Sequence, residues 1–136
     1  MHWTSRYINI PYVDKGRSFD GADCWGLVRL IYLHELGITL PDYGEVSAEN
    51  LAKVHRKVQE VSEHEEWQPI AFEDIQPFDI CAMRAAGKRL VCHVGVVVDK
   101  KRILHVESRI DSAIVDLKDP IIRERIECFR RRKTTL

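Results

Sequence analysis

One cysteine and two histidines of this chain are of the types that could together cleave an acyl bond. Cys24 stands in the stretch GADCWGLVRLIYLHELG, directly after Asp23, where apolar residues begin to recur at helical spacing. Backbone N–H groups in the first turn of a helix carry the positive end of its dipole and stabilise a thiolate. His93 in LVCHVGVVVD and His105 in RILHVES add two imidazoles. The set predicts a nucleophile, Cys24, a base, His93, and a residue that orients the base, His105.

Helical and turn signals define the first half of the chain. A helix is expected from Cys24, with Asp23 as its N-cap and Gly37 as its C-terminal stop. A second helix is expected over 47–63, with Ser47 as a plausible cap. No repeat or linker-like stretch divides the sequence, so we expect a single domain over 1–136.

The period of the apolar residues changes from helical to alternating in the second half. Val97, Gly95 and His93 share one face of a valine-rich strand, whereas Cys92 lies on the other. The short link DKKR predicts a hairpin that brings His93 and His105 together. The fold class expected is α+β, with N-terminal helices packed on an antiparallel sheet of about five strands. The predicted strands are 78–83, 90–99, 102–108, 112–117 and 125–131.

Each of these chemical features also has a plainer interpretation. A histidine in a buried strand is commonly a core residue with one hydrogen bond, and Cys24 with the two histidines could instead bind zinc. Neither alternative explains both a helix-end thiol and a pair of strand histidines as well as nucleophilic catalysis does, so we expect no metal and no cofactor. The other cysteines lie in apolar strand segments and are interpreted as buried packing residues: Cys81, Cys92 and Cys128.

Composition argues against several classes of partner. The chain has 21 basic and 21 acidic side chains, so its formal net charge gives no reason to expect nucleic acid or a membrane surface as partner. The basic segment 123–133, RERIECFRRRK, is interpreted as a solvated chain end, with contact to a polyanion as the alternative. No signal-peptide pattern begins the sequence, which predicts synthesis in the cytoplasm without a signal peptide.

The segments DGADCWGLVRLIYLHELGITLP, IQPFDICAM and CHVGVVVDKKRILHVES together resemble the NlpC family of papain-like cell-wall cysteine peptidases. The resemblance runs from about Ile10 to about Ser108 and is nearest to the version in bacteriophage tail-tip assembly proteins, where a Trp follows the cysteine. It implies a papain-like NlpC-type fold. It also implies that Cys24 is the nucleophile, His93 the general base and His105 the third residue of the triad.

Further roles follow from the same resemblance. Tyr12 matches a family tyrosine that supports the oxyanion or the substrate, and Asp23 and Trp25 flank the nucleophile. Phe78 departs from the pattern, because the family usually has Gly there, and DKGRS replaces the usual W-G-G after the tyrosine.

The resemblance implies hydrolysis of an amide bond in the peptidoglycan peptide stem, between γ-D-glutamyl and the diamino acid. Other phage tail proteins would be partners, and the protein would be virion-associated and act on the host cell wall. The alternative is a structural tail-tip component that keeps the fold without using the chemistry.

Overall fold

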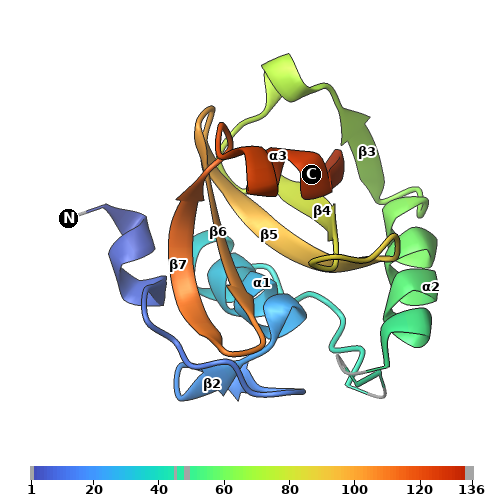
Figure 1. Ribbon diagram of the computed structural model, residues 1–136. Coiled ribbons are helices and arrows are strands. Elements are labelled where there is room, and N and C mark those ends of the chain that lie inside the picture. Colours follow the sequence, from blue (N-terminus) through green and yellow to red (C-terminus); the bar gives the residue numbers. More distant parts are fainter. Residues whose placement is uncertain (1, 45, 48–49, 134–136) are drawn as a thin grey trace.

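A central antiparallel sheet organises the protein (Figure 1). The computed structural model describes residues 2–44, 46–47 and 50–133, and over these the sheet has six strands in the order β3-β8-β4-β5-β6-β7. Their bounds are β3 (Trp67–Ile70), β4 (Ile80–Arg84), β5 (Val91–Asp99), β6 (Arg102–Glu107), β7 (Ile110–Asp116) and β8 (Ile126–Arg132). The expected α+β class is confirmed. The five predicted strands are present, and β3 is additional because its sequence WQPI does not alternate and carries a proline that an edge strand tolerates.

Short helices and a small ribbon surround this sheet. They are η1 (Trp3–Tyr7), the pair β1 (Arg17–Ser18) and β2 (Gly21–Ala22), α1 (Cys24–Ile31), η2 (Tyr32–Leu36), α2 (Leu51–Ser62), η3 (Phe72–Asp74) and α3 (Pro120–Arg125). The predicted start of α1 is confirmed, because Asp23 Oδ1 accepts the Gly26 N–H at 2.8 Å. The stop is confirmed as well: after η2 continues the helical path, Gly37 takes a left-handed conformation with φ 68°.

The second helix begins later than the sequence predicts. Asn50 caps α2 by accepting the Lys53 N–H at 3.3 Å. Ser47, the expected cap, instead donates its hydroxyl to Asp14 at 2.6 Å. The prediction of Ser47 as cap was therefore wrong, because an amide side chain nearer the helix accepts from its first turn.

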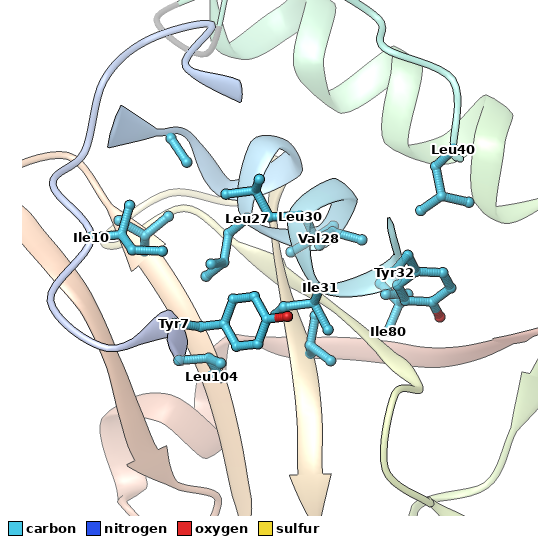
Figure 2. Close-up of a cluster of buried hydrophobic side chains, with 14 of the residues drawn as sticks. Tyr7, Ile10, Leu27, Val28, Leu30, Ile31, Tyr32, Leu40, Ile80 and Leu104 are labelled. Carbon is cyan, nitrogen blue, oxygen red and sulfur yellow. The ribbon is translucent and has the colours of Figure 1, made fainter. Parts of the chain in front are cut away.

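The helices α1 and α3 cover opposite faces of the sheet (Figure 1). The α1 face receives Val94, Val96 and Val98 of β5, together with the side chains around Leu27 and Ile31 that Figure 2 shows. The α3 face receives the intervening Val97 with residues such as Cys81 and Met83. Strand β5 is thus buried on both faces, as its valine-rich sequence predicts.

The basic C-terminal segment is part of the sheet. Within it, α3 caps one face and β8 lies between β3 and β4. Arg131 pairs with the buried carboxylate of Asp79 at 2.8 and 2.9 Å. The interpretation of 123–133 as a solvated chain end was wrong, since Phe129 is buried in the core and Arg130 donates to the Ser62 carbonyl at 3.0 Å. Among the helices described, none combines the length and the apolar character that crossing a bilayer requires.

Candidate active site

The first turn of α1 holds Cys24 in a fixed position. Asp23 is buried and, besides capping the helix, accepts hydrogen bonds from the Arg17 guanidinium at 2.7 Å and from the Lys15 backbone N–H at 3.0 Å. The sequence assigned Asp23 beside the nucleophile, and the structure gives it a cap and an ion pair. The carboxylate thereby fixes the turn from which the thiol projects.

The sulfur of Cys24 lies against strand β5. The backbone N–H groups of Val94 and Trp25 both donate to it. Trp25 belongs to the same helical turn, whereas Val94 directly follows His93. The thiol therefore reaches the sheet at the peptide that joins His93 to Val94.

The hairpin of β5 and β6 has no registered backbone pair at Val94 in the described part of the chain. Val97 exchanges backbone hydrogen bonds with the segment that leads into β4, its N–H donating to Asp79. Because backbone groups alternate in direction along a strand, the Val94 N–H points toward β6. The registered pairs of the hairpin begin only at Val96 and Leu104. The sulfur consequently occupies the side of β5 that the β6 ladder leaves uncovered.

The two histidines meet as the hairpin prediction requires. Nε2 of His93 and Nδ1 of His105 are 2.8 Å apart, and both side chains are buried. One of these nitrogens must donate and the other accept, so the tautomers of the two rings depend on each other. With Nε2 of His93 engaged, its Nδ1, the ring nitrogen nearer the main chain, is the one left for another partner.

Burial opposes charge on both the thiol and the base. It raises the pKa of Cys24 to about 12, and the neighbouring Asp23 carboxylate adds to the shift. Burial likewise lowers the pKa of His93 to about 3, against the opposite pull of Glu107. Both shifts favour a neutral thiol and an uncharged imidazole in the resting site.

An acidic residue that the sequence analysis did not select completes this cluster. Glu107 Oε1 lies 3.7 Å from His105 Nδ1, and Arg125 donates to both Glu107 oxygens at 2.8 and 2.6 Å. A signal was available, because Glu107 follows His105 by two positions and so shares its side of β6.

The cluster also bears on the zinc alternative. That alternative named Cys24 with the two histidines, whereas in the described part of the chain the donor atoms within 4.8 Å of one another belong to His93, His105 and Glu107. The two imidazoles bond to each other and the carboxylate to Arg125. The arrangement is thus a chain of hydrogen bonds and ion pairs whose donors already have protein partners.

An apolar cavity of about 90 Å³ opens beside the thiol. Its walls include Cys24, Trp25 and Val94 on one side and the apolar stripe of α2, with Val58 near its middle, on the other. Trp25 donates its indole N–H to a backbone carbonyl, that of Pro41, at 2.7 Å. Trp25 thus forms a wall of the cavity beside the thiol.

Comparison with known proteins identifies the domain. The family model described as the NlpC/P60 family matches residues 9–131. The chain belongs to the NlpC/P60 family. It is 28% identical over 127 residues to the gamma-DL-glutamyl hydrolase of Bacillus subtilis (strain 168), covering 93% of this chain and 27% of that protein. The chain thus spans about a quarter of that relative's length.

Solved NlpC/P60 structures have the same fold. A lipoprotein-like NLP/P60 protein of Staphylococcus aureus matches with a TM-score of 0.66 and 23% identity, covering 95% of this chain and 38% of that one. The NlpC/p60 domain of the peptidoglycan hydrolase SagA matches with a TM-score of 0.61 and 15% identity, covering 93% and 90% of the two chains. The SagA match covers nearly all of that domain as well as nearly all of this chain.

Of the two remaining family positions of the sequence analysis, Tyr12 lies beside the segment that leads into α1, and Phe78 lies in the turn before β4. The backbone of Tyr12 forms a bridge with Ala22, two residues before Cys24. Phe78 stands where the NlpC family usually has glycine and has φ 75°, a conformation that favours glycine. Its ring packs on Trp3 with centroids 4.6 Å apart. The turn before β4 thus takes the glycine-type conformation with a phenylalanine in place.

Proposed function

We propose that this NlpC/P60 domain hydrolyses an amide bond in the peptide stem of peptidoglycan, with Cys24 as nucleophile, His93 as general base and His105 as the residue that orients His93. The observation that carries the proposal is the contact of the Cys24 sulfur with the Val94 N–H, at the residue next to the His93–His105 pair. Membership of the family and the names of its relatives, a gamma-DL-glutamyl hydrolase and a peptidoglycan hydrolase, support the substrate class.

The mechanism follows from the uncharged resting state. Nδ1 of His93 accepts the thiol proton while the sulfur attacks the carbonyl carbon, and backbone N–H groups at the start of α1 stabilise the oxyanion. The His93 imidazolium then protonates the leaving amine, which leaves a thioester on Cys24. Water, deprotonated by His93, hydrolyses the thioester and restores the thiol.

The bond cleaved in this proposal joins γ-D-glutamyl to the diamino acid. The gamma-glutamyl specificity in the name of the Bacillus subtilis relative supports this choice. Tyr12 and Trp25 flank the site in support of the oxyanion and the substrate. We place the protein in a phage tail, with other tail proteins as partners and the host wall as its target. The support for this placement is the Trp that follows the cysteine.

Digestion of purified muropeptides, followed by mass analysis of the products, tests the proposal. The unaltered protein should release fragments cut after γ-D-glutamate, and Cys24→Ala should lose at least about 10³-fold of the rate. Cys128→Ala removes a thiol of β8 that is not among the walls of the cavity beside Cys24. It is the matched control and should cleave normally.

One observation favours a second candidate, a tail component that keeps the fold without chemistry. Burial raises the pKa of Cys24, and a raised pKa is typical of unreactive cysteines that serve only in packing. Muropeptides left intact by the unaltered protein, or cleaved equally well by Cys24→Ala, would support this candidate against the hydrolase.

A further inference from the structure

A charged pair stands directly behind the two histidines. Glu107 ends β6 and its side chain is 19% exposed, while that of Arg125 is 11% exposed. The pair is bidentate, with both Arg125 terminal nitrogens on the carboxylate at 2.8 and 2.6 Å. Such parallel bonds between a guanidinium and a carboxylate fix geometry more strongly than a single contact does.

The guanidinium is itself held in place. Arg125 is the last residue of α3, and its Nε donates to the Arg84 carbonyl of β4 at 2.9 Å. Ile122 anchors α3 in the core on the same face of the sheet. The carboxylate therefore has a fixed position 3.7 Å from His105, whose other contact is His93.

The pair sets the charge around the histidines. Burial would raise the pKa of Glu107, but the Arg125 hydrogen bonds and the charges of His93, His105 and Arg125 together lower it to about 2. Glu107 is thus ionised at neutral pH. It favours a positive charge on His93, while Arg125 and a charged His105 oppose one. Cys92 is the remaining titratable group that feels both members of the pair.

We infer that Glu107 is a positioning residue of the proposed reaction: clamped by Arg125, its carboxylate stabilises the positive charge that His93 acquires when it takes the Cys24 proton. This inference rests on the proposed function. It accounts for how the uncharged, buried His93 imidazole can act as base. The positive charge that forms on His93 is stabilised by the fixed carboxylate of Glu107, which lies next to His105. Arg125, as the opposing charge, sets how strong that effect is.

Two substitutions with opposite electrostatic signs test the inference. Glu107→Gln removes the negative charge and keeps the shape of the side chain, whereas Arg125→Gln leaves the carboxylate without its counter-charge. The rate of alkylation of Cys24 by iodoacetamide at pH 7, followed by peptide mass spectrometry, reports how readily the thiol gives its proton to His93. It should fall about tenfold in Glu107→Gln and rise about tenfold in Arg125→Gln, as a change of one pKa unit implies.

A control and a fold measurement separate charge from structure. Glu124→Gln removes an exposed carboxylate from the same helix and should alkylate at the normal rate. Urea unfolding of each variant shows whether the domain is folded under the conditions of alkylation. Loss of packing alone would expose the thiol and raise the rate of alkylation in both variants. The inference is therefore overturned if the rate changes in the same direction in both variants, or if it changes in neither.

The experiment distinguishes failure of this inference from failure of the hydrolase proposal. Opposite shifts in alkylation, combined with muropeptides left intact, would uphold the role of Glu107 toward the thiol and its base while removing the proposed reaction. Normal cleavage of muropeptides, combined with unchanged alkylation rates in both variants, would overturn the role of Glu107 and leave the proposed reaction intact. Where Glu107→Gln does not fold, a rise in Arg125→Gln supports the inference if this variant unfolds in urea as the unaltered protein does, and a fall or no change overturns it.

Discussion

The shifted pKa values of the Cys24 thiol, which is partly exposed, and of the buried His93 ring both favour the uncharged forms of these groups at rest. Transfer of the proton from one to the other during attack keeps the pair neutral overall and avoids the cost of isolating either charge. The alternative, a standing thiolate, would require the site to compensate a buried anion permanently. Asp23, the nearest carboxylate, opposes that state.

Acid should destabilise the domain through its buried histidines. The pKa of His93 falls from 6.5 to about 3 on folding because of burial, and that of His105 is lowered as well. The unfolded chain therefore binds protons that the folded state refuses. The stability due to His93 is complete above pH 6.5 and declines as the pH falls toward 3.

Urea unfolding of the unaltered protein and of His93→Gln measures this effect. Between pH 7 and pH 4.5 the unaltered protein should lose about 3 kcal/mol more than the variant does, since two pKa units correspond to that free energy. Equal losses in the two proteins would show that His93 is protonated in the folded state.

The sequence made the central residues of this site predictable, whereas it hid their surroundings. A cysteine at a helix start and two histidines on adjacent strands are local patterns, and the DKKR link fixes the hairpin that joins the histidines. Arg125 is 18 positions from Glu107 and belongs to a helix that no apolar periodicity indicates. The uncharged state of Cys24 depends on burial, which residue spacing does not report.

At the scale of elements, Ser112 ties the N-terminal segment to β7. Its buried hydroxyl donates to the Tyr7 carbonyl and accepts the Ile10 N–H at 2.7 Å. Ser112→Ala leaves two buried backbone groups without a partner, so the free energy of unfolding should fall by about 1–3 kcal/mol for each group left unpaired. Urea unfolding measures the loss. Ser5→Ala, at an exposed hydroxyl, is the control, and an equal loss in both variants would contradict the assigned role.

The helix α2 forms the outer wall of the cavity beside Cys24. Val58→Trp should fill this cavity and reduce the rate of muropeptide cleavage at least about tenfold by blocking access to the thiol. The exposed Gln59 on the same helix gives the control, Gln59→Trp, which should cleave at the normal rate. Unimpaired cleavage by Val58→Trp would mean that the substrate reaches Cys24 without using this cavity.

Elements with a strong periodic pattern were predictable, and those with short or mixed sequences were not. The helix α1 and the strands β5 and β6 follow from spacing, capping and alternation. The strand β3 has four residues including a proline, and α3 has six residues, so neither shows a full period. Pairing with β8 specifies β3 instead, and packing of Ile122 in the core specifies α3.

For the whole molecule, the order of the strands is the property least accessible from sequence. The last strand, β8, lies between β3 and β4, so pairs of residues more than 40 positions apart form the ladder, such as Ile80 with Arg130. No local signal distinguishes such an inserted strand from a solvated basic end. Its insertion is what brings α3 over the face of the sheet that contains Val97, and Arg125 to Glu107.

The central claim is that the Cys24 sulfur forms a bond to the substrate carbonyl. Acid quenching of the protein during muropeptide turnover, followed by peptide mass spectrometry, detects that thioester directly. We predict a mass increase equal to the γ-D-glutamyl-terminated fragment on the peptide that contains Cys24, absent in Cys24→Ala. Steady release of products with every cysteine unmodified, and with turnover retained in Cys24→Ala, would contradict the account.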